Sequence, residues 1–137
     1  MTINVVCGII IKDKRILAMK RGKHKYDYLE YKYEFPGGKI ERDENSKKAL
    51  IRELKEELDL NFKPSDIKFF TEIKHDYPDF TIIMKAYFCF CRKCDFTMKE
   101  HLEYKYLKPE ELETLQWADA DLKIIKEIKR KSEYFSK

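Results

Sequence analysis

The sequence predicts an α/β fold, in which an α/β/α sandwich is built around a central mixed β-sheet. Two observations lead to this expectation. Short apolar segments with the pattern of strands stand on both sides of one central amphipathic helix, and a second amphipathic helix follows near the end of the chain. The chain has 137 residues, a length that suits one domain with a substantial core, so we expect residues 1–137 to form a single domain.

The composition is ordinary for a soluble protein, with 43% hydrophobic and 39% charged residues. The formal net charge of +4 is mild, so it fits a small anionic substrate and does not demand nucleic acid. No apolar run approaches the length of a membrane span, and the first residues lack the pattern of a signal peptide. We therefore expect a cytoplasmic protein that binds neither membranes nor nucleic acid stably.

The first part of the chain predicts a hairpin. Residues 3–11 form an apolar run rich in Val and Ile, which is typical of a buried strand, and a polar turn separates them from a second strand at residues 15–20. Residues 36–38, Pro-Gly-Gly, predict a tight turn with exposed backbone groups.

Four tyrosines recur among charged residues between these features, at Tyr26, Tyr28, Tyr31 and Tyr33. One interpretation is that their rings are buried and their hydroxyls are solvated. The other is that they form a stacking wall for a nucleobase. Taken one tyrosine at a time, the pattern favours the first interpretation.

The central helix is predicted to begin near Asn45 or Ser46, either of which suits an N-cap, and to end near Asp59. Its apolar arc, which should face the core, consists of Leu50, Ile51, Leu54 and Leu58. The adjoining arc consists of Glu53, Glu56 and Glu57. A solvated acidic face would explain these glutamates, but clustered carboxylates are also the hard oxygen ligands that suit Mg²⁺ or Mn²⁺.

The second half predicts a loop at residues 64–66, strands at residues 67–74 and 80–91, and a hairpin loop at residues 75–79. A further strand at residues 103–107 precedes a short helix that starts at residues 108–112, with proline in its first turn. Residues 119–132 predict the terminal amphipathic helix, because apolar residues recur there at helical spacing.

The four cysteines are Cys7, Cys89, Cys91 and Cys94. The Cys91-x-x-Cys94 spacing with Cys89 nearby is compatible with part of a zinc site. A second pair of ligands is missing from the sequence, since neither His75 nor His101 belongs to a paired motif. Inert free thiols are therefore the favoured interpretation.

The turn and the central helix together resemble the signature of the Nudix hydrolase family. The matching residues are Gly38, Glu44, Arg52, Glu53, Leu54, Glu56, Glu57 and Leu60. Asp59 stands where the family usually has a glycine that ends the helix, and aspartate tolerates left-handed backbone geometry better than most residues. Residues 34–41, Glu-Phe-Pro-Gly-Gly-Lys-Ile-Glu, resemble the MutT subgroup, and the order of elements extends the resemblance over the whole chain.

The resemblance implies a role for each matched position. The implied metal ligands are Glu53, Glu56, Glu57 and the backbone carbonyl of Gly37, with Mg²⁺ as cofactor and Mn²⁺ as an alternative. Arg52 would orient Glu53, which is the candidate general base, while Glu44 would support the loop and the start of the helix. Glu100 matches a further acid and could be the base instead of Glu53.

The implied substrate-binding residues are Arg21, Phe35, Lys39 and Asp121. Lys39 either touches a phosphate or is a solvated turn lysine. Asp121 either reads the base or is a helix N-terminal acid favoured by the helix dipole.

The implied activity is Mg²⁺-dependent hydrolysis of a nucleoside triphosphate to the monophosphate and pyrophosphate, of the type that cleanses nucleotide pools. The implied substrates are 8-oxo-dGTP or CTP and dCTP, and the protein would act as a monomer or homodimer. The alternatives are a Nudix hydrolase for ADP-ribose or dinucleoside polyphosphates, and a nucleotide-binding module without catalysis.

Overall fold

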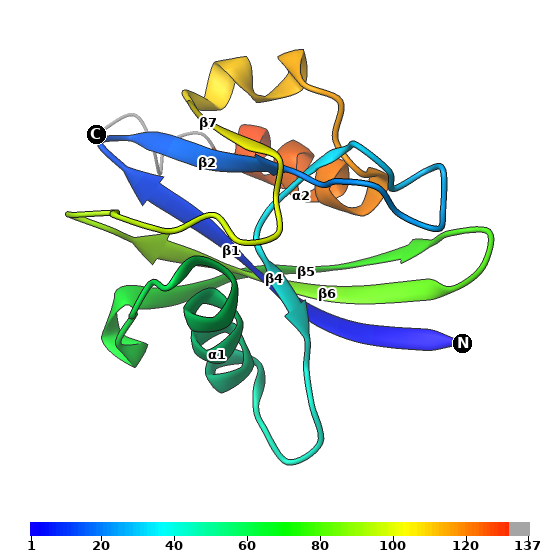
Figure 1. Cartoon of the computed structure of the whole chain (residues 1–137), viewed down its shortest axis with the longest axis horizontal. Coiled ribbons are helices and arrows are strands. Elements are labelled where there is room, and N and C mark those ends of the chain that lie inside the picture. The colour runs from blue at the N-terminus through cyan, green and yellow to red at the C-terminus, as the bar shows by residue number, and fades with distance from the viewer. Residues whose placement is uncertain (132–137) are drawn as a thin grey trace.

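A mixed β-sheet forms the centre of the computed structural model, which describes residues 1–131 (Figure 1). The strands are β1 (Thr2–Lys12), β2 (Arg15–Lys20), β3 (Tyr33–Glu34), β4 (Gly37–Lys39), β5 (Ile67–Asp76), β6 (Thr81–Phe90) and β7 (Glu103–Leu107). Their order is β3-β2-β1-β6-β5, with β4 paired to β1 and β7 paired to β2. Strands β1 and β6 run parallel, whereas β1 pairs with β2 and with β4 in antiparallel fashion. The predicted hairpin of β1 and β2 is confirmed.

Helices cover both faces of this sheet. They are α1 (Ser46–Leu58), α2 (Asp119–Arg130) and the short 3₁₀ helices η1 (Pro64–Asp66) and η2 (Pro109–Thr114). Successive residues of a strand point to opposite faces, so Val6 and Ile10 of β1 pack in the cluster that contains α1, whereas Cys7 and Ile9 pack in the cluster that contains α2. The predicted α/β/α sandwich is therefore confirmed.

The ends of α1 follow from its capping residues. The side chain of Asn45 accepts a hydrogen bond from the backbone N–H of Lys48 at 2.9 Å, which satisfies one of the free donors at the helix start. Asp59 ends the helix in the left-handed conformation, with φ 57° and ψ 32°. Leu50, Leu54 and Leu58 of the predicted apolar arc all have 0% exposure, whereas Ile51, its fourth member, is only partly buried.

The predicted tight turn at residues 36–38 is wrong, because Gly37 and Gly38 belong to β4. Gly38 pairs with Val6 of β1, and Gly37 pairs with Cys7. A Cβ atom added to Gly37 would lie 2.0 Å from the carbonyl oxygen of Val6. Glycine is therefore needed here for the close approach of two strands.

Other differences are at the edges of elements. Residues 64–66 form the 3₁₀ helix η1 where a loop was predicted, and β5 extends to Asp76, into the predicted hairpin loop. Strand β3 was not predicted, because two residues are too short for any periodicity. Helix α2 ends at Arg130, and Ser132, the predicted last helical residue, lies outside the described residues. In the described chain, none of the helices has the length and apolar character of a membrane span.

We expect that Leu54→Ala lowers the free energy of unfolding by about 2–5 kcal/mol, because it deletes a buried side chain between α1 and the sheet. Urea unfolding measures this effect. Lys48→Ala is the matched control on the exposed side of α1, and it should change stability by less than about 0.5 kcal/mol. Equal losses in the two variants would contradict the packing of α1 described above.

Candidate active site

A cavity of about 440 Å³ lies beside β4 and is lined by residues from both halves of the chain. Its acids are Glu34, Glu53, Glu57, Glu100 and Asp121. Its aromatic residues are Tyr26, Phe35, Tyr77 and Phe80, and its basic residues include Arg21 and Lys39. The cavity therefore combines a concentration of carboxylates with an apolar, aromatic lining.

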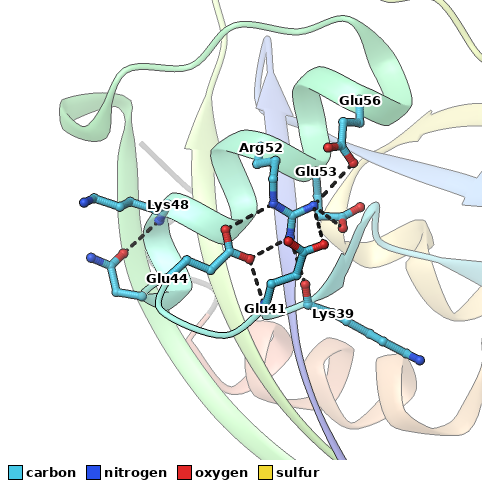
Figure 2. A network of polar contacts seen from close by, with 8 residues as sticks. Lys39, Glu41, Glu44, Lys48, Arg52, Glu53 and Glu56 are labelled. Carbon is cyan, nitrogen blue, oxygen red and sulfur yellow. Dashed lines mark hydrogen bonds and ion pairs between the residues drawn. The ribbon is translucent and has the colours of Figure 1, made fainter.

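Arg52 of α1 connects the acids of the helix to the loop before it. Figure 2 shows its guanidinium among the surrounding carboxylates. Nη2 donates to Glu44 Oε1 at 2.6 Å, and Nε donates to Glu44 Oε2 at 3.1 Å. Nη1 donates to Glu53 at 2.9 Å and to Glu56 at 3.3 Å. Nη2 also donates to the carbonyl oxygen of Lys39 at 3.1 Å, which ties α1 to β4.

Glu53 lies directly against β4. A Cβ atom on Gly38 would be 2.4 Å from Glu53 Cδ, so glycine leaves the space that the carboxylate fills. Burial raises the pKa of Glu53, while the hydrogen bond and charge of Arg52 lower it.

Glu57 is the most strongly perturbed carboxylate of α1. Its side chain is only 9% exposed, and its Oε1 atom has no hydrogen-bond partner. Burial raises its pKa to about 9, and the neighbouring charges of Glu34, Glu53 and Glu100 act in the same direction. Near neutral pH this carboxyl group holds a proton unless another cation replaces it.

The residues present suit a hard divalent cation. Glu57 offers a buried oxygen with no partner, Glu53 is adjacent, and Gly37 contributes backbone to the same cavity. Across residues 1–131, no three acidic, histidine or cysteine side chains are already gathered as a metal cluster. Glu56 in particular is turned toward Arg52, with 59% of its side chain exposed, and does not line the cavity.

Sequence reasoning assigned no role to two residues of this site, Glu34 and His101. The carboxylate of Glu34 bonds to Arg21 Nη1 at 3.3 Å through Oε1 and to His101 Nε2 at 2.8 Å through Oε2. His101 Nδ1 lies 4.0 Å from Glu57 Oε2. The sequence feature that could have pointed to Glu34 is its position directly before Phe35. For His101, the corresponding feature is only its position next to Glu100.

Asp121 is buried in the first turn of α2, with 6% exposure. Its Oδ2 accepts a hydrogen bond from the backbone N–H of Phe35 at 2.9 Å. Burial raises its pKa to about 8, with a further contribution from the charge of Glu34. The side chain is therefore largely protonated at neutral pH, so it can donate as well as accept. The ring of Phe35 packs on Trp117 with 4.8 Å between centroids.

The four tyrosines have different environments. Tyr33 is buried, with its hydroxyl donating to Glu103, as the first interpretation expects. Tyr26 stacks on Tyr28 at 5.2 Å, and Tyr28 stacks on Tyr77 at 5.1 Å, so part of the segment builds an aromatic wall at the cavity. Tyr28 also donates to Asp79 at 2.8 Å, which joins the loop after β2 to the β5–β6 hairpin. Tyr31, by contrast, is 49% exposed.

The structure brings most of the predicted site residues together around the cavity. They are Arg21, Phe35, Gly37, Gly38, Lys39, Glu53, Glu57, Glu100 and Asp121. Arg52 and Glu44 are bonded to each other outside the lining, where they support Glu53 and the loop. Glu56 is the predicted metal ligand that the structure leaves outside the cavity.

Cys7 lines the acidic cavity, whereas Cys89, Cys91 and Cys94 do not. Cys89 and Cys94 are buried, and burial raises the pKa of Cys91 to about 12. Among residues 1–131, no third ligand is gathered with any two of them in an arrangement that could hold a metal ion.

A family model described as the NUDIX domain matches residues 1–134. An 8-oxo-dGTP diphosphatase of Buchnera aphidicola subsp. Schizaphis graminum is 35% identical over 129 residues, which cover 93% of each chain. A CTP pyrophosphohydrolase of Escherichia coli is 46% identical over 56 residues, covering 41% of this chain and 40% of that relative. The solution structure of the E. coli ORF135 protein is similar, with a TM-score of 0.80 at 27% identity over 94% of this chain and 89% of that one. The chain therefore belongs to the Nudix family, as a pyrophosphohydrolase of the MutT-like type.

We expect Gly37→Ala to lower the free energy of unfolding by about 3 kcal/mol or more, because the new Cβ would collide with the backbone of β1. Gly22→Ala is the control, since its Cβ would meet only Leu102, at 3.6 Å. Its effect should stay within about 0.5 kcal/mol. Thermal or urea unfolding measures both, and similar stability of the two variants would show that β4 does not need glycine at position 37.

Proposed function

We propose that this chain hydrolyses a nucleoside triphosphate of the 8-oxo-dGTP type or the CTP/dCTP type, releasing the monophosphate and pyrophosphate. The cofactor is Mg²⁺, with Mn²⁺ as an alternative. Residues 1–137 act as one Nudix domain in the cytoplasm, on a free nucleotide. Relatives whose names carry these two substrates support this choice of substrate class.

The main support for the proposal is that one cavity contains both clustered carboxylates and aromatic surface. Glu53, Glu57 and Glu100 supply negative charge that needs a cation, while Tyr26 and Phe35 supply aromatic surface. A volume of about 440 Å³ is in the range of small-ligand sites. A metal-bound triphosphate and its nucleoside require this combination of charge and apolar surface.

The glutamates of α1 have two roles in the proposed reaction, metal binding and proton transfer. Glu53 and Glu57 would hold the metal together with the carbonyl oxygen of Gly37. Glu56 would join them only by turning from Arg52, to which it is bonded at 3.3 Å, toward the cavity. When bound, the metal neutralises phosphate charge and lowers the pKa of water. Glu53 takes the proton of the attacking water, because its hydrogen bond with Arg52 fixes its orientation at 2.9 Å. Glu100 is the alternative base.

The second group of residues binds the substrate. Arg21 and Lys39 contact the anionic part, and Phe35 contributes to the apolar wall. Asp121 reads the base, and its raised pKa allows it to present a donor as well as an acceptor to a nucleobase edge.

Incubation of the purified chain with Mg²⁺ and each substrate tests the proposal. The panel contains the common nucleoside triphosphates, 8-oxo-dGTP, ADP-ribose and a diadenosine polyphosphate, and the products are separated as pyrophosphate or phosphate. We expect pyrophosphate from 8-oxo-dGTP or a cytidine nucleotide. Glu53→Gln should lower kcat by about 10²–10⁴-fold, because it removes the proton acceptor, while Lys48→Ala should leave kcat unchanged.

Two results would contradict the proposal. Cleavage of ADP-ribose or the diadenosine compound without turnover of any triphosphate would favour another Nudix substrate class. Nucleotide binding without hydrolysis in the wild-type protein would favour a non-catalytic module.

We further expect metal affinity to depend on pH through Glu57. Its pKa of about 9 means that the metal must displace a proton at neutral pH. As the pH rises toward this pKa, fewer protons compete with the metal for the carboxylate, so the affinity for the metal increases. Between roughly pH 6.5 and pH 8.5, the Kd for Mn²⁺ should fall about tenfold per pH unit. Electron paramagnetic resonance of free Mn²⁺ measures this. Glu57→Gln should make the Kd for Mn²⁺ independent of pH. A wild-type Kd that does not change with pH would contradict the assignment of Glu57 as a metal ligand.

A further inference from the structure

His101 occupies a position between the two functional halves of the cavity. It lies in the segment before β7 and has a side-chain exposure of 4%. Nε2 is 2.8 Å from Glu34 Oε2, and Nδ1 is 4.0 Å from Glu57 Oε2. Glu34 in turn uses its other oxygen to pair with Arg21 at 3.3 Å. The imidazole ring thus stands between the carboxylate proposed to bind metal and the arginine proposed to bind substrate.

The sheet holds these groups in a fixed frame. Strand β2 has β3 on one side, where Met19 pairs with Glu34, and β7 on the other, where Lys20 pairs with Glu103. The residue after His101 is anchored as well, because the backbone N–H of Leu102 donates to the carbonyl of Lys20 at 2.9 Å. Strand pairing next to His101 therefore holds its backbone in place, so the ring keeps a fixed position between Glu34 and Glu57.

Histidine suits this position because its two ring nitrogens point in different directions from one rigid plane. Both Glu57 Oε1 and His101 Nδ1 are buried and have no hydrogen-bond partner. A small displacement of Glu57 would bring its carboxylate within hydrogen-bond distance of Nδ1. Carboxylates that bind metals are commonly held in place by such outer hydrogen bonds.

We infer that His101 is a positioning residue, which holds Glu57 at one ring nitrogen and the Glu34–Arg21 pair at the other. It thereby couples the placement of the metal to the placement of the substrate. This inference rests on the proposed function, because it assumes a metal at Glu57 and a nucleotide at Arg21.

Three substitutions at His101 separate its contact with Glu34 from its contact with Glu57. His101→Leu removes both nitrogens. His101→Gln keeps a donor that can reach Glu34 in place of Nε2, whereas the shorter His101→Asn keeps a donor on the Glu57 side in place of Nδ1. Tyr106→Phe is the control, because Tyr106 lies on β7, packs in the core cluster with α1 and does not line the cavity.

The readouts are the Kd for Mn²⁺ without nucleotide, measured by electron paramagnetic resonance, and the KM for nucleotide at saturating Mg²⁺. We expect His101→Leu to weaken Mn²⁺ binding about 10–100-fold and to raise KM. His101→Gln should restore KM but not Mn²⁺ affinity, and His101→Asn should show the reverse. Tyr106→Phe should change neither quantity.

If His101→Leu leaves both Kd and KM unchanged, the inference is overturned. A lower melting temperature alone would show that His101 contributes only to stability. If His101→Leu does not fold, the opposite responses of His101→Gln and His101→Asn decide the question, and identical responses would overturn it. If the wild-type protein binds Mn²⁺ and hydrolyses triphosphates, and the His101 variants behave in the same way, the role of His101 is refuted but the proposed function stands. Wild-type protein that binds no Mn²⁺ refutes the proposed function and, with it, this inference.

Discussion

The contacts of Arg52 hold the acidic side of the site in place. Its guanidinium bonds to both oxygens of Glu44, to Glu53 and to the carbonyl of Lys39, so one side chain joins α1, the loop before it and β4. Hydrogen bonding to Glu44 is the main reason that the pKa of Arg52 is raised. Only a planar group with several fixed donors can make these contacts at once, and a lysine ammonium cannot replace it. The orientation of Glu53 depends directly on this network.

Negative charge accumulates around the buried carboxyl group of Glu57. Glu57 faces the charges of Glu34, Glu53 and Glu100 from a buried position, and the pKa of its carboxyl group rises to about 9 as a result. Such a site takes up a proton when no other cation is bound, which makes it receptive to a divalent metal. Arg21 pairs with Glu34, and its charge also lowers the pKa of Asp121. The Nudix fold therefore concentrates its acids beside a cavity, at a cost in electrostatic repulsion.

Some parts of the site were predictable from local pattern, and others were not. The limits of α1 and its buried leucines followed from capping residues and helical spacing, and the convergence of Glu53 and Glu57 followed from the same geometry. Glu56 shares their spacing but turns to Arg52, because the position of a long side chain depends on its partners. His101 carried no signal in the sequence, since a single histidine before a strand has many ordinary explanations.

The sequence by itself determined the class of fold, the helix that carries the acids and the membership of the Nudix family, because these depend on periodicity and on residues close together in the chain. Tertiary structure alone decided the environment of Asp121, which bonds to Phe35 across a separation of 86 residues. It also decided that Gly37 serves a close strand contact, because pairing with β1 is a long-range event. Burial and neighbouring charge, which set the pKa values of Asp121 and Glu57, exist only once the strands and helices have packed.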